Sequence, residues 1–114
     1  MKDSYLSREE LVKFIATLPT RRLAAGAVIR NEHGELLLVQ PNYKDGWILP
    51  GGTVEAGEAP KPGCFREVEE ELGLRLAPGR LLLVFHGLAR GVWGDSTYYM
   101  YDAGVIAKNT PVTL

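Results

Sequence analysis

The chain has 114 residues, enough for one domain spanning residues 1–114 and too few for a sizeable second one. Hydrophobic residues make up 46% and charged residues 24%, as in ordinary globular proteins, and the net charge is −1. This charge excludes a basic field that could gather nucleic acid or anionic lipid. A phosphate-bearing ligand must therefore be held locally, by a metal ion or a few cations.

Cysteine usage and the N-terminus bear on the compartment. The single cysteine, Cys64, excludes an internal disulfide framework and suits a reducing environment. The first residues, Met1 to Tyr5, contain no apolar signal core, and no apolar stretch is long enough to span a bilayer. We therefore expect a cytoplasmic protein with no membrane or nucleic-acid partner.

The first predicted helix runs from Ser7 to Leu18. Ser7 and Glu10 have the spacing of a capping box, in which each side chain bonds the other residue's backbone N–H, and Pro19 ends the helical pattern. The apolar positions form a single face that needs something to cover. They are Leu11, Phe14, Ile15 and Leu18.

Strand patterns follow the helix. Arg22–Arg30 is predicted to form a strand, and turn-forming residues at 31–34 predict a hairpin into Glu35–Gln40. Two later strands are predicted over Arg80–Leu88 and Thr97–Ile106. The first of these is almost entirely apolar, so we expect a central strand that is dry on both faces. One α/β or α+β domain with a mixed sheet accounts for this order of elements.

A second helix is predicted to begin near Pro60 or Pro62 and to end at Gly73. At about 100° per residue, its apolar positions occupy one arc and three glutamates occupy another. The apolar arc consists of Cys64, Phe65, Val68 and Leu72, and the acidic arc of Glu67, Glu70 and Glu71.

The acidic arc has two interpretations. Like charges three and four residues apart destabilise an isolated helix, and such clusters are commonly solvated faces, here relieved by an Arg66–Glu70 pair. The alternative is a hard-cation site, because Mg²⁺ prefers oxygen ligands and clustered carboxylates supply them. The surrounding sequence is needed to decide between them.

That sequence contains a specific motif. Gly52 is followed after five residues by Glu58, and after seven more by the segment Arg66–Leu74 (REVEEELGL). The arrangement resembles the Nudix box, G-x5-E-x7-R-E-U-x-E-E-x-G-U with U a bulky aliphatic residue, at every defined position. The chain is therefore similar to Nudix hydrolases over about residues 21–107.

The resemblance implies an α/β/α sandwich with a mixed sheet, in which residues 1–19 are an N-terminal helical segment and residues 20–114 hold the sheet and the box helix. It also implies metal-dependent hydrolysis, with Mg²⁺ or Mn²⁺, of a nucleoside diphosphate linked to another group. The products would be a nucleoside monophosphate and the phosphorylated remainder. The alternative is a Nudix-fold module that binds a nucleotide without cutting it.

Residue roles follow from the resemblance where the motif matches. Glu67, Glu70 and Glu71 would ligate the metal together with the backbone carbonyl of Gly51. Arg66 would hold Glu67 through a charge-assisted hydrogen bond. The catalytic candidates are Arg66, Glu67 and Glu70. The general base would be Glu67 or an acid outside the box.

Three further box residues would be structural: Glu58 would brace the loop, Gly52 would permit a close approach, and Gly73 would cap the helix. The chain departs from the usual pattern at Gly63, where Nudix helices carry a small residue such as alanine, so we expect a loosened first turn. It also ends at Leu114, before the usual second sandwich helix. We therefore expect a C-terminally shortened sandwich, or else the N-terminal helix or a second subunit, as in a homodimer, covering the remaining sheet face.

The substrate-binding candidates lie ahead of the box. Tyr43 and Lys44 occupy a loop and Trp47 opens the approach to the motif, where an aromatic ring could stack a base. Trp93 and the tyrosines near residue 100 could also stack, although core packing is the stronger interpretation for these tyrosines. No substrate subclass can be named from the sequence.

Overall fold

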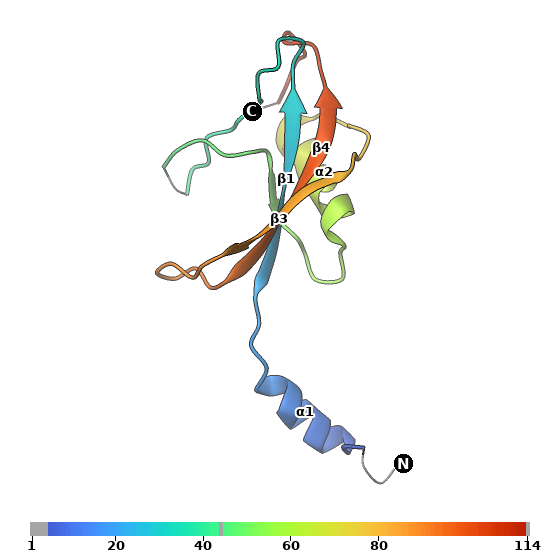
Figure 1. Cartoon of the computed structure of the whole chain (residues 1–114), viewed down its shortest axis with the longest axis vertical. Coiled ribbons are helices and arrows are strands. Elements are labelled where there is room, and N and C mark those ends of the chain that lie inside the picture. Colours follow the sequence, from blue (N-terminus) through green and yellow to red (C-terminus); the bar gives the residue numbers. More distant parts are fainter. Residues whose placement is uncertain (1–4, 44, 114) are drawn as a thin grey trace.

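The computed structural model describes residues 5–43 and 45–113, which form helices α1 and α2 and strands β1 to β4 (Figure 1). The order along the chain is α1, β1, β2, α2, β3, β4. Their bounds are Arg8–Ala16, Arg22–Arg30, Gly51–Thr53, Pro60–Leu72, Leu81–Gly87 and Ser96–Val105, respectively. The predicted α+β class is confirmed. Within the described residues, neither helix is long and apolar enough to cross a membrane.

The strands form one mixed sheet in the order β2-β1-β4-β3. β1 and β4 pair in parallel, with Ala25 opposite Tyr99, whereas β2 and β3 pair antiparallel with β1 and β4. A parallel pair requires a long connection, and here the connection between β1 and β4 contains α2, which packs over β1. The mixed sheet predicted from the sequence is therefore confirmed.

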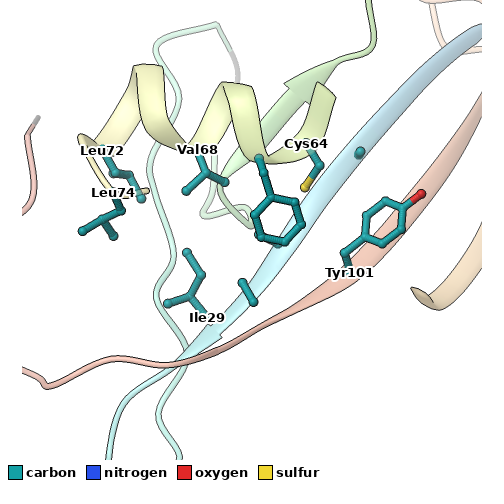
Figure 2. Close-up of a cluster of buried hydrophobic side chains, with 10 residues drawn as sticks. Ile29, Cys64, Val68, Leu72, Leu74 and Tyr101 are labelled. Carbon is teal, nitrogen blue, oxygen red and sulfur yellow. The ribbon is translucent and has the colours of Figure 1, made fainter. Parts of the chain in front are cut away.

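The core lies between α2 and the sheet (Figure 2). Because side chains alternate along a strand, every second residue of β1 and β4 points toward α2. The apolar arc of α2 packs against these residues as predicted. Burial raises the pKa of the Cys64 thiol to about 12, so the thiol stays protonated and packs as a small apolar group. The core residues are Ala25, Ala27, Ile29, Cys64, Phe65, Val68, Leu72, Leu74, Tyr101 and Ala103.

The ends of α2 agree with the prediction. The helix begins at Pro60, where a missing N–H leaves no helical bond unmade. It ends at Gly73, which caps it with φ 70° and donates its N–H to the carbonyl of Glu69 at 2.8 Å. Glycine suits this position because other residues rarely adopt a left-handed conformation.

The predicted hairpin after β1 forms only in part. Its turn is present, because the side-chain oxygen of Asn31 accepts hydrogen bonds from backbone N–H groups within the turn. The strand expected over Glu35–Gln40 is absent, and isolated bridges at Leu36 and Val39 replace it. Leu36 pairs with the end of β1 and Val39 with Ile48, so neither pairing extends into a ladder.

β3 is not the central strand that its apolar sequence predicted. It lies at the edge of the sheet, and Leu81 to Phe85 remain 41–48% exposed. α2 lies over β1 and β4, and β4 is the sole described element that β3 contacts. The prediction was wrong because an apolar run indicates a preference for burial, whereas the strand order and the neighbouring layers determine whether burial occurs.

α1 has the predicted capping box: Ser7 Oγ accepts from the N–H of Glu10 at 3.1 Å, and Glu10 Oε1 accepts from the N–H of Ser7 at 3.0 Å. The helix points away from the sheet and contacts none of the other described helices and strands (Figure 1). The expectation that α1 covers the second sheet face within its own chain is therefore wrong. The radius of gyration is 18.2 Å, against about 13 Å for a compact chain of similar length.

Candidate metal and active site

Gly51 begins β2, and its N–H and carbonyl point away from β1 toward the free edge of the sheet. The N–H of Ala27 bonds the carbonyl of Pro50 at 2.9 Å, and bonded and non-bonded positions alternate along an antiparallel pair. The N–H and carbonyl of Gly51 therefore face away from β1, at the free edge of β2. With φ 146° and the backbone of Ala25 where a Cβ would lie, position 51 requires glycine.

Two of the predicted ligands adjoin this edge. The N–H of Gly51 donates to the Glu71 carboxylate, and the Glu67 carboxylate lies against Gly52, where a Cβ would be 2.9 Å from Glu67 Cδ. Partial burial, and then the charge of Glu67, raise the pKa of Glu71 above its ordinary value. α2 thus presents two mutually repelling carboxylates beside the outward-facing carbonyl of Gly51.

Arg66 connects the loop before α2 to the acidic arc. Its Nε and Nη2 donate to the two oxygens of Glu58 at 2.6 and 3.0 Å, which is a bidentate pair. Its Nη1 donates to Glu67 at 3.2 Å and to Glu70 at 3.0 Å. The Arg66–Glu67 contact expected from the motif is present, but Glu58 makes the shorter and more complete contact with Arg66.

Glu58 also fixes its own loop. Its Oε1 accepts from the N–H of Glu55 at 3.0 Å, and Arg66, followed by this N–H, lowers the pKa of Glu58 to about 2. The carboxylate packs on α2 at Gly63, where a Cβ would lie 2.6 Å from Oε1. The loosened turn expected at Gly63 is not observed, because its N–H bonds the carbonyl of Ala59 at 3.1 Å. Glycine at this position makes room for the Glu58 carboxylate.

The donor set suits a hard divalent cation in its chemistry. Glu67, Glu71 and the Gly51 carbonyl supply oxygen ligands from one small region, and a cation there would offset the partial burial and the Glu67 charge that raise the pKa of Glu71. Among the described residues, no three acidic, histidine or cysteine side chains converge at metal-site spacing. Glu70 is bound to Arg66 instead. Its side chain is 61% exposed, and it would have to leave Arg66 to join the other two carboxylates.

Glu69, at the undefined position of the motif, takes no part in this arrangement. Its carboxylate accepts a hydrogen bond from Arg75 Nε at 2.7 Å, and the Arg75 side chain is strongly exposed. Neighbouring residues of one helix therefore face different surroundings, because each step along a helix turns by about 100°. Glu69 provides a matched control for the acidic arc.

The substrate candidates ahead of the box are also exposed. Tyr43 and Trp47 expose 61% and 64% of their surfaces, whereas Lys44 lies outside the described residues. The ring of Tyr43 lies 6.1 Å from that of Trp93, and the guanidinium of Arg22 lies 4.8 Å from the centre of the Trp93 ring. Sequence reasoning missed Arg22, because no motif marks the first residue of a strand as the neighbour of a distant tryptophan.

The tyrosines of β4 divide between the two sheet faces. Tyr101 is buried beside Phe65, with ring centres 6.5 Å apart, and Tyr99 packs against the same core, as the core-packing interpretation predicted. Tyr98 lies on the opposite face beside Phe85, with the centres of the two rings 5.0 Å apart. Burial raises the pKa of Tyr98 to about 12.

Known proteins are similar to this chain in fold and in sequence. The NUDIX domain family matches residues 20–111. The MutT protein from Methanosarcina mazei is 30% identical with a TM-score of 0.72, covering 86% of this chain and 72% of that one. A UDP-X diphosphatase is 25% identical with a TM-score of 0.66, covering 97% of this chain and 58% of that one. The chain therefore belongs to the NUDIX family.

Curated relatives match a shorter region. Diphosphoinositol polyphosphate phosphohydrolase 2 from Rattus norvegicus is 43% identical over 72 residues, which are 61% of this chain and 40% of the relative. The chain spans less than half the length of the first curated relatives that it matches.

The packing of Glu58 on Gly63 predicts an unusual stability effect. Alanine is favoured over glycine inside a helix by about 1 kcal/mol, yet Gly63→Ala should lower the free energy of unfolding. The new Cβ would displace a carboxylate that Arg66 holds at both oxygens. In a Glu58→Ala background, the same Gly63→Ala change should raise the free energy of unfolding. Urea titrations of the four proteins measure the difference, and an effect of the same sign in both backgrounds would contradict it.

The lowered pKa of Glu58 predicts a pH dependence. Because the pKa is about 2 in the folded protein against 4.5 ordinarily, ionised Glu58 stabilises the fold fully above about pH 4.5. That contribution is lost as the pH falls from 4.5 toward 2. Glu58→Gln should therefore have a lower free energy of unfolding than wild type at neutral pH. Between pH 4.5 and 2, its free energy of unfolding should fall by less than that of wild type. Denaturant titrations at several pH values provide the test, and parallel curves for both proteins would refute it.

Proposed function

We propose that this protein is a metal-dependent Nudix pyrophosphohydrolase. Its substrate is a nucleoside diphosphate linked to another group, and its products are a nucleoside monophosphate and the phosphorylated remainder. The main support is the juxtaposition of Glu67 and Glu71 with the outward-facing Gly51 peptide, in a chain with a complete Nudix box. The matched UDP-X diphosphatase and the diphosphoinositol polyphosphate phosphohydrolase also support cleavage of a diphosphate linkage.

The proposed cofactor is Mg²⁺ or Mn²⁺, held by Glu67, Glu70, Glu71 and the Gly51 carbonyl. When bound, such an ion neutralises diphosphate charge and lowers the pKa of a coordinated water. The ordinary oxygen-ligand preference of both ions supports the assignment.

The residues of the chain itself perform three tasks in this proposal. Arg66 positions Glu67 and Glu70 from one side, because a planar guanidinium can bond several oxygens at once. Glu58 keeps Arg66 and the preceding loop in place. Glu67 would accept the proton of the attacking water through Oε2, because its Oε1 already bonds Arg66.

A second function has specific support. A nucleotide-binding module without hydrolysis would explain why no three candidate ligands converge among the described residues. The two functions differ in whether bound nucleotide is cleaved when Mg²⁺ is added. A screen of nucleoside diphosphate derivatives with Mg²⁺, reading out monophosphate or phosphate release, therefore separates them. We further assign a cytoplasmic location, which the reduced, buried Cys64 supports.

We also infer a homodimer in which α1 packs on the uncovered sheet face of its partner. α1 has nine residues, and isolated helices of that length are marginally stable in water. Its apolar residues and those of β3 are exposed in the same chain. Reciprocal exchange would bury both surfaces at once with two-fold symmetry.

The carboxylate assignments predict the effect of charge-neutral substitutions. Glu70→Gln and Glu71→Gln should each reduce Mg²⁺-dependent hydrolysis by several orders of magnitude, whereas Glu69→Gln should have little effect. Glu71→Gln should be as stable as wild type or slightly more so, because the raised pKa of Glu71 means that its ionised form destabilises the fold as the pH rises above 4.5. Turnover and melting temperature are measured on all three variants. Near-wild-type turnover by both Glu70→Gln and Glu71→Gln would refute the metal site.

The homodimer is tested by sedimentation velocity at micromolar concentration. Wild type should sediment as a dimer and Phe14→Glu as a monomer, because a charge would enter the apolar face of α1. Lys13→Glu, on the opposite side of α1, should remain dimeric. A well-folded wild-type monomer, or equal behaviour of the two variants, would rule out the exchanged helix.

A further inference from the structure

Three separate segments bring aromatic and cationic side chains together at one corner of the sheet. Tyr43 comes from the loop before β2, Trp93 from the β3–β4 connection and Arg22 from the start of β1. We call these residues the aromatic corner. Arg22 alternates with the core residues Ala25 and Ala27 along β1, so the corner lies on the sheet face opposite α2.

The geometry of the corner leaves ring surface available to a ligand. The Tyr43 and Trp93 rings are inclined at 49° with centres 6.1 Å apart, and both residues remain more than half exposed. The Arg22 guanidinium lies over the Trp93 ring at 4.8 Å, a cation–π contact that restrains the indole. The corner is therefore a solvent-exposed aromatic surface in which Arg22 restrains one of the two rings.

The corner and the carboxylate site lie near different residues of the same strand, β1. Gly51 pairs with Gly26, which is four residues along β1 from Arg22, or about 13 Å of strand. Tyr43 precedes Gly51 by eight residues within the same segment. Because the corner lies on the face opposite α2, a ligand that engages both regions would pass around the free edge of β2, where the Gly51 carbonyl lies.

We propose that the aromatic corner stacks the nucleobase of the substrate. This assignment rests on the proposed function, and it names the residues that hold the base of the nucleoside diphosphate substrate. Every base presents a π-face, and stacking on an exposed indole suits any of them. An inositol-type substrate has no such face and needs concentrated cations. The two arginines at this end of β1 are already engaged, Arg22 with Trp93 and Arg21 with Asp95 at 3.8 Å.

Binding of AMP, without added metal, tests the proposal independently of hydrolysis. Calorimetric titration should give a dissociation constant about 10- to 100-fold weaker for Trp93→Ala than for wild type. Trp93→Phe, which keeps a stacking ring, should recover most of the affinity. Val92→Ala is the matched control, because Val92 is 95% exposed in the same turn. Melting temperatures establish that every variant is folded.

Ligands without a base complete the experiment. Ribose 5-phosphate should bind wild type much more weakly than AMP, and its affinity should not change in Trp93→Ala. Equal binding of AMP by wild type and Trp93→Ala would overturn the proposal. So would inositol hexakisphosphate binding more tightly than AMP and independently of Trp93.

Hydrolysis separates this proposal from the proposed function. With ADP-ribose and Mg²⁺, Trp93→Ala should raise KM by a factor similar to the loss of AMP affinity, with little change in kcat. A wild-type protein that binds AMP through Trp93 but hydrolyses no nucleoside diphosphate derivative would refute the proposed function and retain the stacking site. Hydrolysis with an unchanged KM in Trp93→Ala would refute the stacking site and retain the proposed function.

Discussion

The candidate site depends on one interaction, the bidentate pair between Arg66 and Glu58. It joins the loop after β2 to the first half of α2 with contacts of 2.6 and 3.0 Å. The remaining guanidinium nitrogen is thereby directed at Glu67 and Glu70. Arg66 bonds both of these acids through a single nitrogen, Nη1, so the pair with Glu58 is what fixes the orientation of the guanidinium. The positions of the acidic side chains therefore follow from a residue that we do not place in contact with substrate.

The close packing of carboxylates explains two glycines of the site. A carboxylate held at both oxygens needs a defined volume, and Gly63 supplies it on the surface of α2. Gly52 does the same for Glu67 at the edge of β2. In both places a missing Cβ allows a charged group to lie against backbone. The helix gives up about 1 kcal/mol of propensity at Gly63, and the close packing of Glu58 is what requires it.

Local features of this fold could be predicted from the sequence, because they depend on residues a few positions apart. The capping box at Ser7, the limits of α2 at Pro60 and Gly73, and the apolar arc of α2 belong to this group. Helical spacing predicted that the acidic side chains share one arc of α2, but their interpretation as a metal site required the complete motif. The partner of Arg66 was harder to predict, since Glu58 lies eight residues earlier in the loop before α2, and the spacing does not define the path of that loop.

Features that depend on the order of strands could not be predicted in the same way. The apolar sequence of β3 is compatible with a central or an edge strand, and the parallel β1–β4 pairing is what places it at the edge. The aromatic corner has the same origin. Arg22 and Trp93 are distant in sequence, and they meet because Arg22 pairs with Ser96, which follows the β3–β4 connection. The parallel register that places β3 at the edge therefore also brings a cation from the start of β1 onto an exposed indole. A shift of one residue in this pairing would turn the side chains of one strand to the other face and separate the two groups.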